Sequence, residues 1–209
     1  MDKHYAIFDM DGTLVDSMVY WRHLAEEYLN LKGIRKVSDT ILEKIKPMTM
    51  TESAALFIKE FELNGTPDSV AAEMNDLMNN HYYKDIPLKR GVLDYLKQIH
   101  HAGTIMCVAS ATDVSLMEAC LTRLGIIDYF SFLLSCEMVG VGKSRPDIYF
   151  EAAKRLKAKA GEIAVYEDAL YAAKTAKAAG FYVIGVFDDS AAKHWNELKM
   201  VSDEIIENW

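Results

Sequence analysis

Two aspartates, Asp9 and Asp11, follow directly after the apolar run "YAIF" and are separated by a single residue. The end of a buried strand is a costly place for an unpaired carboxylate, because moving a charge out of water without a partner costs several kcal/mol. The two acids are therefore either ordinary turn residues at the surface or members of a group that also contains positive charge.

Polar side chains follow the later apolar runs as well. Ser110 ends "TIMCVAS", Glu167 and Asp168 end "EIAVYED", and Lys143 comes a short loop after "FSFLLS". Ligands of an open parallel sheet bind outside the carboxyl ends of its strands, so these residues should meet on one rim. Mg²⁺ prefers one or two carboxylates together with phosphate oxygens. The pattern predicts a site for a divalent cation and an anionic ligand.

The elements that must position these residues alternate along the chain. Short apolar runs typical of strands covered on both faces are separated by amphipathic stretches of helical period. The strand-like runs are 5–8, 104–110, 130–135, 162–168 and 181–187, and the helical stretches are 92–103, 115–125, 147–158 and 170–180. This alternation predicts an α/β fold whose core is a Rossmann-like, doubly wound parallel sheet of five strands.

One interval breaks the alternation, because no strand-like run occurs from residue 16 to residue 87. Its helical patterns cover 17–31, 38–46, 52–62 and 67–83. An all-helical block placed after the first strand predicts an inserted helical-bundle cap domain. We therefore expect a catalytic core made of 1–15 and 88–209, a cap made of 16–87, and two hinges near 14–17 and 85–89.

Composition narrows the class of protein. The 209 residues are 51% hydrophobic, which is ample for a core, and the net charge of −8 argues against a nucleic-acid partner.

The three cysteines lack CxxC spacing and are expected to be core thiols of a reducing compartment. Acids occur before any long apolar run, so no signal peptide is predicted. The apolar runs are too short to span a membrane, and we expect a cytoplasmic protein.

The motifs resemble those of the haloacid dehalogenase superfamily, in particular its phosphohydrolases with a helical cap. The stretch "DMDGTLVDS" (9–17) is similar to the first motif of that family, Ser110 in "VAS" to the second, Lys143 in "GKSRPDIY" to the third and "YEDA" (166–169) to the fourth. The resemblance covers nearly the whole chain and points to the branch that contains β-phosphoglucomutase and phosphoglycolate phosphatase.

The resemblance implies a role for each motif residue. Asp9 would be the nucleophile that becomes an aspartyl-phosphate, and Asp11 would protonate the leaving oxygen and then activate water. Ser110 and nearby backbone N–H groups, such as that of Ala111, would hold the phosphoryl oxygens, and Lys143 would balance their charge.

The same resemblance implies Mg²⁺ as cofactor. Its ligands would be Asp9, Asp168 and the backbone carbonyl of Asp11, and Thr13 would belong to the tight turn that aims Asp11 at the substrate. Glu167 would either bind the metal directly or orient its other ligands. Arg145 competes with Lys143 for the phosphate contact, because it lies only two residues further on.

Trp21 and Met50 are expected to select the substrate from the cap side. The segment 48–53 offers polar side chains for the same purpose, although it could also just begin a cap helix with Thr51 or Ser53 as its N-cap. The expected partner is a small phosphorylated metabolite, and neither a membrane nor a second copy of the chain is expected, so the protein should be a monomer.

The predicted activity is therefore that of a Mg²⁺-dependent phosphatase, a phosphoric monoester hydrolase. The alternative is a β-phosphoglucomutase-type mutase, but the positions where that branch carries a histidine and a cap arginine appear here as Trp21 and Met50. A receiver-like phosphorylation switch is disfavoured by the helical insert. Cleavage of phosphonates stays open, since that branch uses a cap lysine and the cap contains Lys32, Lys36, Lys44, Lys46 and Lys59.

Overall fold

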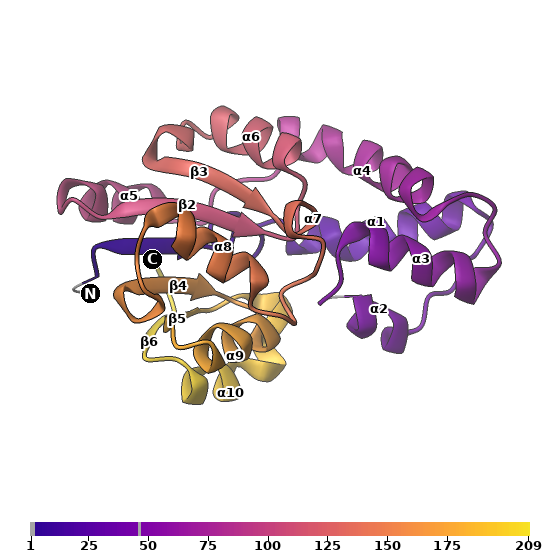
Figure 1. Cartoon of the computed structure of the whole chain (residues 1–209). Helices are drawn as coiled ribbons and strands as arrows, with labels where there is room; N and C mark the ends of the chain where they lie inside the picture. Colours follow the sequence, from indigo (N-terminus) through magenta and orange to yellow (C-terminus); the bar gives the residue numbers. More distant parts are fainter. Residues whose placement is uncertain (1–2, 46) are drawn as a thin grey trace.

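The computed structural model describes residues 3–45 and 47–209, and its centre is a six-stranded parallel sheet of order β3-β2-β1-β4-β5-β6 (Figure 1). The strands are β1 (Tyr5–Phe8), β2 (Ile105–Ser110), β3 (Phe130–Ser135), β4 (Ile163–Glu167), β5 (Tyr182–Val186) and β6 (Glu204–Ile206). The predicted doubly wound α/β fold is confirmed, and Lys46 of the predicted helix 38–46 lies outside the described residues.

The predicted number of five strands is wrong, because β6 adds a sixth strand at the edge of the sheet. β6 is only three residues long and begins with an acid, so no apolar run marks it. Its pairing with β5 is supported by Asp203, the residue before β6, whose carboxylate accepts a hydrogen bond from the backbone N–H of Val183 at 2.8 Å. Tertiary pairing, and not local composition, makes this segment a strand.

The sheet is covered on both faces, as its continuously apolar strands require. Ala6 and Phe8 of β1 belong to one buried cluster and Ile7, which points to the opposite face, belongs to another. The first face is covered by α5 (Val92–His101) and α6 (Val114–Arg123), and the second by α8 (Asp147–Leu156), α9 (Leu170–Ala178) and α10 (Trp195–Val201).

Between β1 and α5 lie four helices and, among the described residues of 16–87, no strand. They are α1 (Met18–Leu31), α2 (Asp39–Ile45), α3 (Met50–Phe61) and α4 (Pro67–Lys84). Figure 1 shows them grouped beyond the tips of the strand arrows, on the side of the carboxyl ends. α3 begins two residues earlier than expected, because Thr49 and Glu52 form a capping box; the prediction of Thr51 or Ser53 as N-cap is wrong.

The α1–α4 group touches the core at the loop that carries Lys143. Gly142 lies so close to the carbonyl oxygen of Pro47 that a side-chain carbon at position 142 would collide with it. The backbone N–H of Thr51 donates to Glu137 at 3.3 Å, and Lys193 forms an ion pair with Glu43. The first turn of α3 is therefore held beside the Lys143 loop.

Short elements complete the described chain: the 3-10 helices η1 (Ile127–Tyr129), η2 (Ala160–Glu162) and η3 (Asp189–His194), and the single turn α7 (Cys136–Val139). All three cysteines are free thiols buried in the interior, as predicted. None of the helices in the described ranges has the length and apolar character needed to cross a membrane.

Candidate active site

The polar strand ends meet where the strand order reverses. β2 and β3 lie on one side of β1, and β4 and β5 lie on the other, so the crevice between β1 and β4 is the switch point where open α/β sheets bind ligands. The backbone N–H of Asp9 donates to the carbonyl of Tyr166 at 3.0 Å, which joins the ends of the two strands. Asp9 therefore lies beside Glu167 and Asp168.

A tight turn follows Asp9 and requires glycine at its third position. Gly12 has a φ of +83°, and a side-chain carbon there would collide with the carboxylate of Asp168. The hydroxyl of Thr13 donates to the same carboxylate at 3.4 Å. The turn thereby packs its backbone directly against the end of β4.

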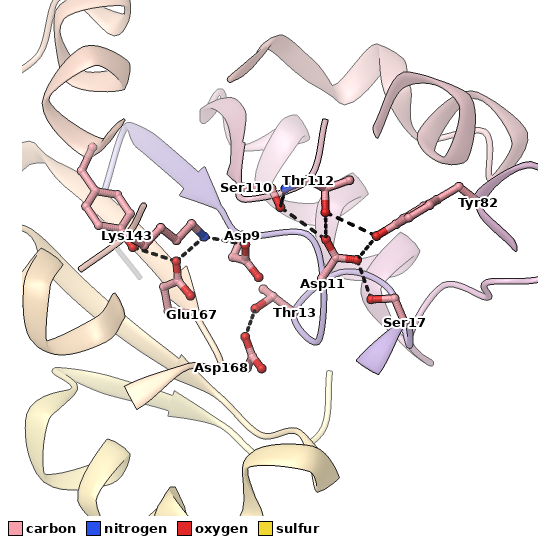
Figure 2. A network of polar contacts seen from close by, with 11 residues as sticks. Asp9, Asp11, Thr13, Ser17, Tyr82, Ser110, Thr112, Lys143, Glu167 and Asp168 are labelled. Atoms are coloured by element: carbon pink, nitrogen blue, oxygen red, sulfur yellow. Dashed lines mark hydrogen bonds and ion pairs between the residues drawn. The ribbon is translucent and has the colours of Figure 1, made fainter. Parts of the chain in front are cut away.

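A charged cluster occupies one half of the site, and it consists of Asp9, Lys143, Glu167 and Asp168 (Figure 2). The ammonium of Lys143 lies 2.5 Å from Asp9 Oδ1 and 2.6 Å from Glu167 Oε1. Tyr149, on α8, also donates to Glu167 Oε1, at 2.8 Å. Lys143 is only 3% exposed, so its attraction to the two acids acts with little solvent screening.

The charged cluster holds more negative than positive charge. Burial raises the pKa of Asp9 to about 8, with Glu167 and Asp11 adding to the shift and Lys143 opposing it. Burial, Asp9 and Glu167 likewise raise the pKa of Asp168 well above its usual range. Burial alone would lower the pKa of Lys143, but the attraction of Asp9 and Glu167 outweighs it and raises that pKa. Lys143 is therefore charged, and one lysine does not balance three acids.

The donor atoms of the charged cluster fit a hard divalent cation. One carboxylate oxygen each from Asp9, Glu167 and Asp168 lie within 4.8 Å of one another, and all three residues are buried. Oxygen ligands with excess negative charge are what Mg²⁺ binds in proteins. Since Glu167 Oε1 is already occupied by Lys143 and Tyr149, only its second oxygen is available to a metal.

A hydroxyl cluster surrounds Asp11 in the other half of the site. Asp11 Oδ1 accepts hydrogen bonds from Ser17 at 2.6 Å and from Tyr82 at 2.7 Å. Asp11 Oδ2 accepts from Thr112 at 2.5 Å and from Ser110 at 3.3 Å. Figure 2 shows Tyr82 reaching Asp11 from the side opposite Lys143. Asp9 and Asp11 are thus two residues apart in sequence but have entirely different partners.

The remaining predicted residues surround these two clusters. Trp21 is half-buried and donates its indole N–H to the hydroxyl of Tyr82 at 2.8 Å. Met50 is the first residue of α3 and half-buried, and Ala111 follows β2 and is half-buried as well. Arg145 points away from the charged cluster: its side chain is 66% exposed and pairs with Asp147 at 3.2 Å.

Four residues of the site were missed from the sequence. Ser17 ends the first predicted motif and Thr112 lies two residues after Ser110, so their hydroxyls could have been noticed there. Tyr149 lies on the apolar face of a predicted helix, where a buried phenol needs a hydrogen-bond partner. Tyr82 is separated from Asp11 by 71 residues and has no local signal that points to the site.

Comparison with known proteins finds relatives of nearly the whole chain. Residues 6–186 match the family model "Haloacid dehalogenase-like hydrolase". "Fructose-1-phosphate phosphatase YqaB" of Escherichia coli is 27% identical over 89% of this chain and 98% of its own. "Beta-phosphoglucomutase" of Bacillus subtilis is 28% identical over 86% of this chain and 81% of its own.

Solved structures share the fold. The structure of CbbY from Rhodobacter sphaeroides in complex with xylulose-(1,5)bisphosphate has a TM-score of 0.83 and 21% sequence identity, and the match covers 99% of this chain and 94% of that one. The coverage includes α1–α4, so the helical insert as well as the sheet has its counterpart in a known structure.

Proposed function

The chain belongs to the haloacid dehalogenase-like hydrolase family, and from this premise we propose that it is a Mg²⁺-dependent phosphatase of a small phosphorylated metabolite such as a sugar phosphate. The observation that carries the proposal is the separation of the two aspartates. Asp9 faces a buried cation, Lys143, whereas Asp11 faces hydroxyl groups. A nucleophile must be ionised when it attacks, and the Lys143 cation opposes the rise in the pKa of Asp9 that burial causes. Asp11 lies away from that cation among groups that can exchange hydrogen bonds, which suits a residue that gives and takes a proton.

Asp9 is the nucleophile in the first step. Its carboxylate oxygen forms a bond to phosphorus, and the bond from phosphorus to the leaving oxygen breaks. The leaving oxygen keeps the electron pair and takes a proton from Asp11. Ser110, the backbone N–H of Ala111 and Lys143 bind the phosphoryl oxygens, and Thr13 holds the turn that aims Asp11.

Water completes the second step. Asp11, now ionised, takes a proton from a water molecule that attacks the aspartyl-phosphate, and phosphate leaves from Asp9. Asp9, Asp168 and the backbone carbonyl of Asp11 would hold Mg²⁺, with Glu167 binding it or orienting its ligands. When bound, the metal supplies positive charge that stabilises the phosphoryl oxygens as charge develops on them.

The helices α1–α4 act as a cap, which we assign to residues 16–87, on a core of 1–15 and 88–209. Both chain crossings lie on the rim that carries Asp9, so the cap can close over the phosphate and exclude water while the intermediate forms. Trp21 and Met50 are the proposed substrate contacts of the cap. The contact of Pro47 with Gly142 supports this, because it brings the start of α3 beside the Lys143 loop.

A mutase related to β-phosphoglucomutase is the second candidate, since such a relative matches the chain. A mutase must hold a second phosphate group. Trp21 gives its N–H to Tyr82, and Met50 has no charge, so neither offers a cation for that phosphate. This favours water as the final acceptor and therefore a phosphatase.

The proposal is tested by measuring phosphate release from a panel of sugar and polyol phosphates, beginning with fructose 1-phosphate, in Mg²⁺ and in EDTA. We expect turnover that depends on the metal and is lost in Asp9→Asn. Release that persists in Asp9→Asn would contradict covalent catalysis. A phosphosugar product from β-glucose 1-phosphate, in place of free phosphate, would identify a mutase, and release from a phosphonate would identify the lysine-dependent branch.

A further inference from the structure

Asp11 is held by hydroxyl groups from both parts of the molecule. Ser110 and Thr112 follow β2 of the core, and Ser17 lies between β1 and α1. Tyr82 comes from the last turn of α4, far along the chain, and its side chain is completely buried. The orientation of the Asp11 carboxyl therefore depends on a residue of the helical insert.

Trp21 and the contact distances together give the direction of the hydrogen bond between Tyr82 and Asp11. An indole N–H can only donate, so the Tyr82 oxygen must accept from Trp21 at 2.8 Å. The single proton of the phenol is then left for one of two neighbours: Asp11 Oδ1 at 2.7 Å or the hydroxyl of Thr112 at 3.3 Å. The shorter contact to a carboxylate is the stronger one, so Tyr82 donates to Asp11.

The end of α4 that carries Tyr82 is tied to the core. Arg123 on α6 donates from Nε to the backbone carbonyl of Tyr82 at 3.0 Å, and its terminal nitrogen donates to the carbonyl of Ile86. These two carbonyls belong to the last turn of α4 and the residues after it, where no helical N–H is available. In this conformation the Tyr82 hydroxyl is therefore held beside the sheet and Asp11.

We propose that Trp21 and Tyr82 form a relay of two hydrogen bonds that positions Asp11 for proton transfer to the leaving oxygen. This rests on the proposed function, and Tyr82 is a positioning residue that keeps its own proton throughout. Because Trp21 donates to the Tyr82 oxygen and the Tyr82 proton goes to the shorter of its two remaining contacts, Asp11 Oδ1 remains an acceptor. The hydroxyls of Ser110 and Thr112 can rotate, so Oδ2 carries the proton that is transferred.

The kinetic test compares Tyr82→Phe with Tyr28→Phe. Tyr28 is a matched control, because it is also a buried tyrosine of the insert and donates to a carboxylate, that of Glu73 at 2.7 Å. Neither Tyr28 nor Glu73 belongs to the two clusters of the site. Substrates are p-nitrophenyl phosphate, whose leaving group needs no proton, and the best alkyl phosphate of the panel. Tyr82→Phe should lower kcat for the alkyl phosphate about 10-fold with KM unchanged, and change p-nitrophenyl phosphate turnover less than about 2-fold.

A double variant tests whether Tyr82 acts through Asp11. Residues of one network are not additive, so adding Tyr82→Phe to Asp11→Asn should cause no further loss. Full additivity of the losses from Tyr82→Phe and Asp11→Asn would overturn the relay. An equal loss of kcat in Tyr82→Phe with p-nitrophenyl phosphate and with the alkyl phosphate would overturn it as well. A parent enzyme without Asp9-dependent phosphatase activity would instead overturn the proposed function, and the catalytic role of the relay with it.

A spectroscopic measurement tests the relay without turnover. The chain has three tryptophans, and the indole ¹H–¹⁵N signal that disappears in Trp21→Phe identifies Trp21. That signal should shift, and its hydrogen should exchange faster, in Tyr82→Phe but not in Tyr28→Phe. A Trp21 signal that is the same in Tyr82→Phe and in the parent would overturn the proposal.

Discussion

Asp9 and Asp11 lie in one turn, yet the two halves of the site around them are built differently. The charged cluster joins Asp9 to Lys143, Glu167 and Asp168, all of which lie at or after strand ends of the sheet. The hydroxyl cluster joins Asp11 to residues of the sheet and also to Tyr82 of α4. The proposed nucleophile is thus supported by the sheet alone, whereas the proposed acid depends on the helical insert as well.

The largest effect is expected from Asp9→Asn, which removes the proposed nucleophile and replaces a carboxylate by an amide. Turnover should fall about 10⁴-fold or more, while Lys143 keeps its ion pair with Glu167 and the fold persists. A phosphate-release assay measures the turnover, and a circular dichroism spectrum shows whether the fold persists. Substantial residual activity would mean that the charged cluster does not contain the nucleophile.

Asp11→Asn probes the hydroxyl cluster and should have a smaller, selective effect. General acid–base catalysis contributes about 10²–10⁴-fold, so a loss of that size is expected for alkyl phosphates. Activated aryl phosphates should be affected much less, because their leaving groups need no proton. Turnover of a series of phosphate esters ranked by leaving-group pKa measures the difference, and an equal loss along the series would remove Asp11 from the role of acid.

The stabilities of two variants compare the clusters: Lys143→Met changes the charged cluster, and Thr112→Val changes the hydroxyl cluster. Removing one partner of a buried ion pair typically costs about 3–5 kcal/mol of unfolding free energy, and here it leaves Asp9 and Glu167 without their cation. Losing one hydroxyl hydrogen bond typically costs about 1 kcal/mol. Urea unfolding measures both variants. If Lys143→Met were no less stable than Thr112→Val, the Lys143 cation would not be needed to offset the buried acids of the charged cluster.

Metal and pH should both act on the charged cluster. Burial raises the pKa of Asp9 to about 8, so without metal the folded protein keeps a proton that the unfolded chain loses near pH 4. The native state then binds more protons, and the free energy of unfolding falls as the pH rises from about 4 to about 8. Mg²⁺ at 100 times its Kd should add about 2.7 kcal/mol at the upper end of this range.

Urea unfolding in EDTA and in Mg²⁺ at several pH values measures this dependence. Asp168→Asn is the control, because it removes one acid of the cluster and should weaken both the slope with pH and the effect of the metal. Stability that rises with pH in EDTA would contradict the excess of buried negative charge.

The smallest effect is expected from Met50→Ala, which changes neither cluster. Met50 begins α3 beside the Lys143 loop and is half-buried, so its loss should alter contacts with the part of the substrate beyond the phosphate. We expect changes of about 10-fold or less in kcat/KM that reorder the preferred metabolites but leave p-nitrophenyl phosphate unchanged. An unaltered ranking would remove Met50 from substrate selection.

Sequence alone was sufficient for the five longer strands of the sheet and for the charged cluster. Each of its members lies at or shortly after the end of an apolar run, and parallel strands bring their carboxyl ends to one rim whatever the details of packing. The helical insert was equally visible, because an interval without strand-like runs is a local property. The short edge strand β6 was not, since its three residues become a strand only by pairing with β5.

Tertiary structure alone decided how Asp11 is held. Tyr82 lies 71 residues from Asp11, and its hydroxyl reaches the carboxylate only because α4 ends beside α6, where Arg123 binds its last carbonyls. The sequence predicted Trp21 as a substrate contact but gave no sign that its N–H donates to Tyr82. Strand ends follow from local periodicity, whereas hydrogen bonds between distant helices depend on packing angles that no short stretch of sequence encodes.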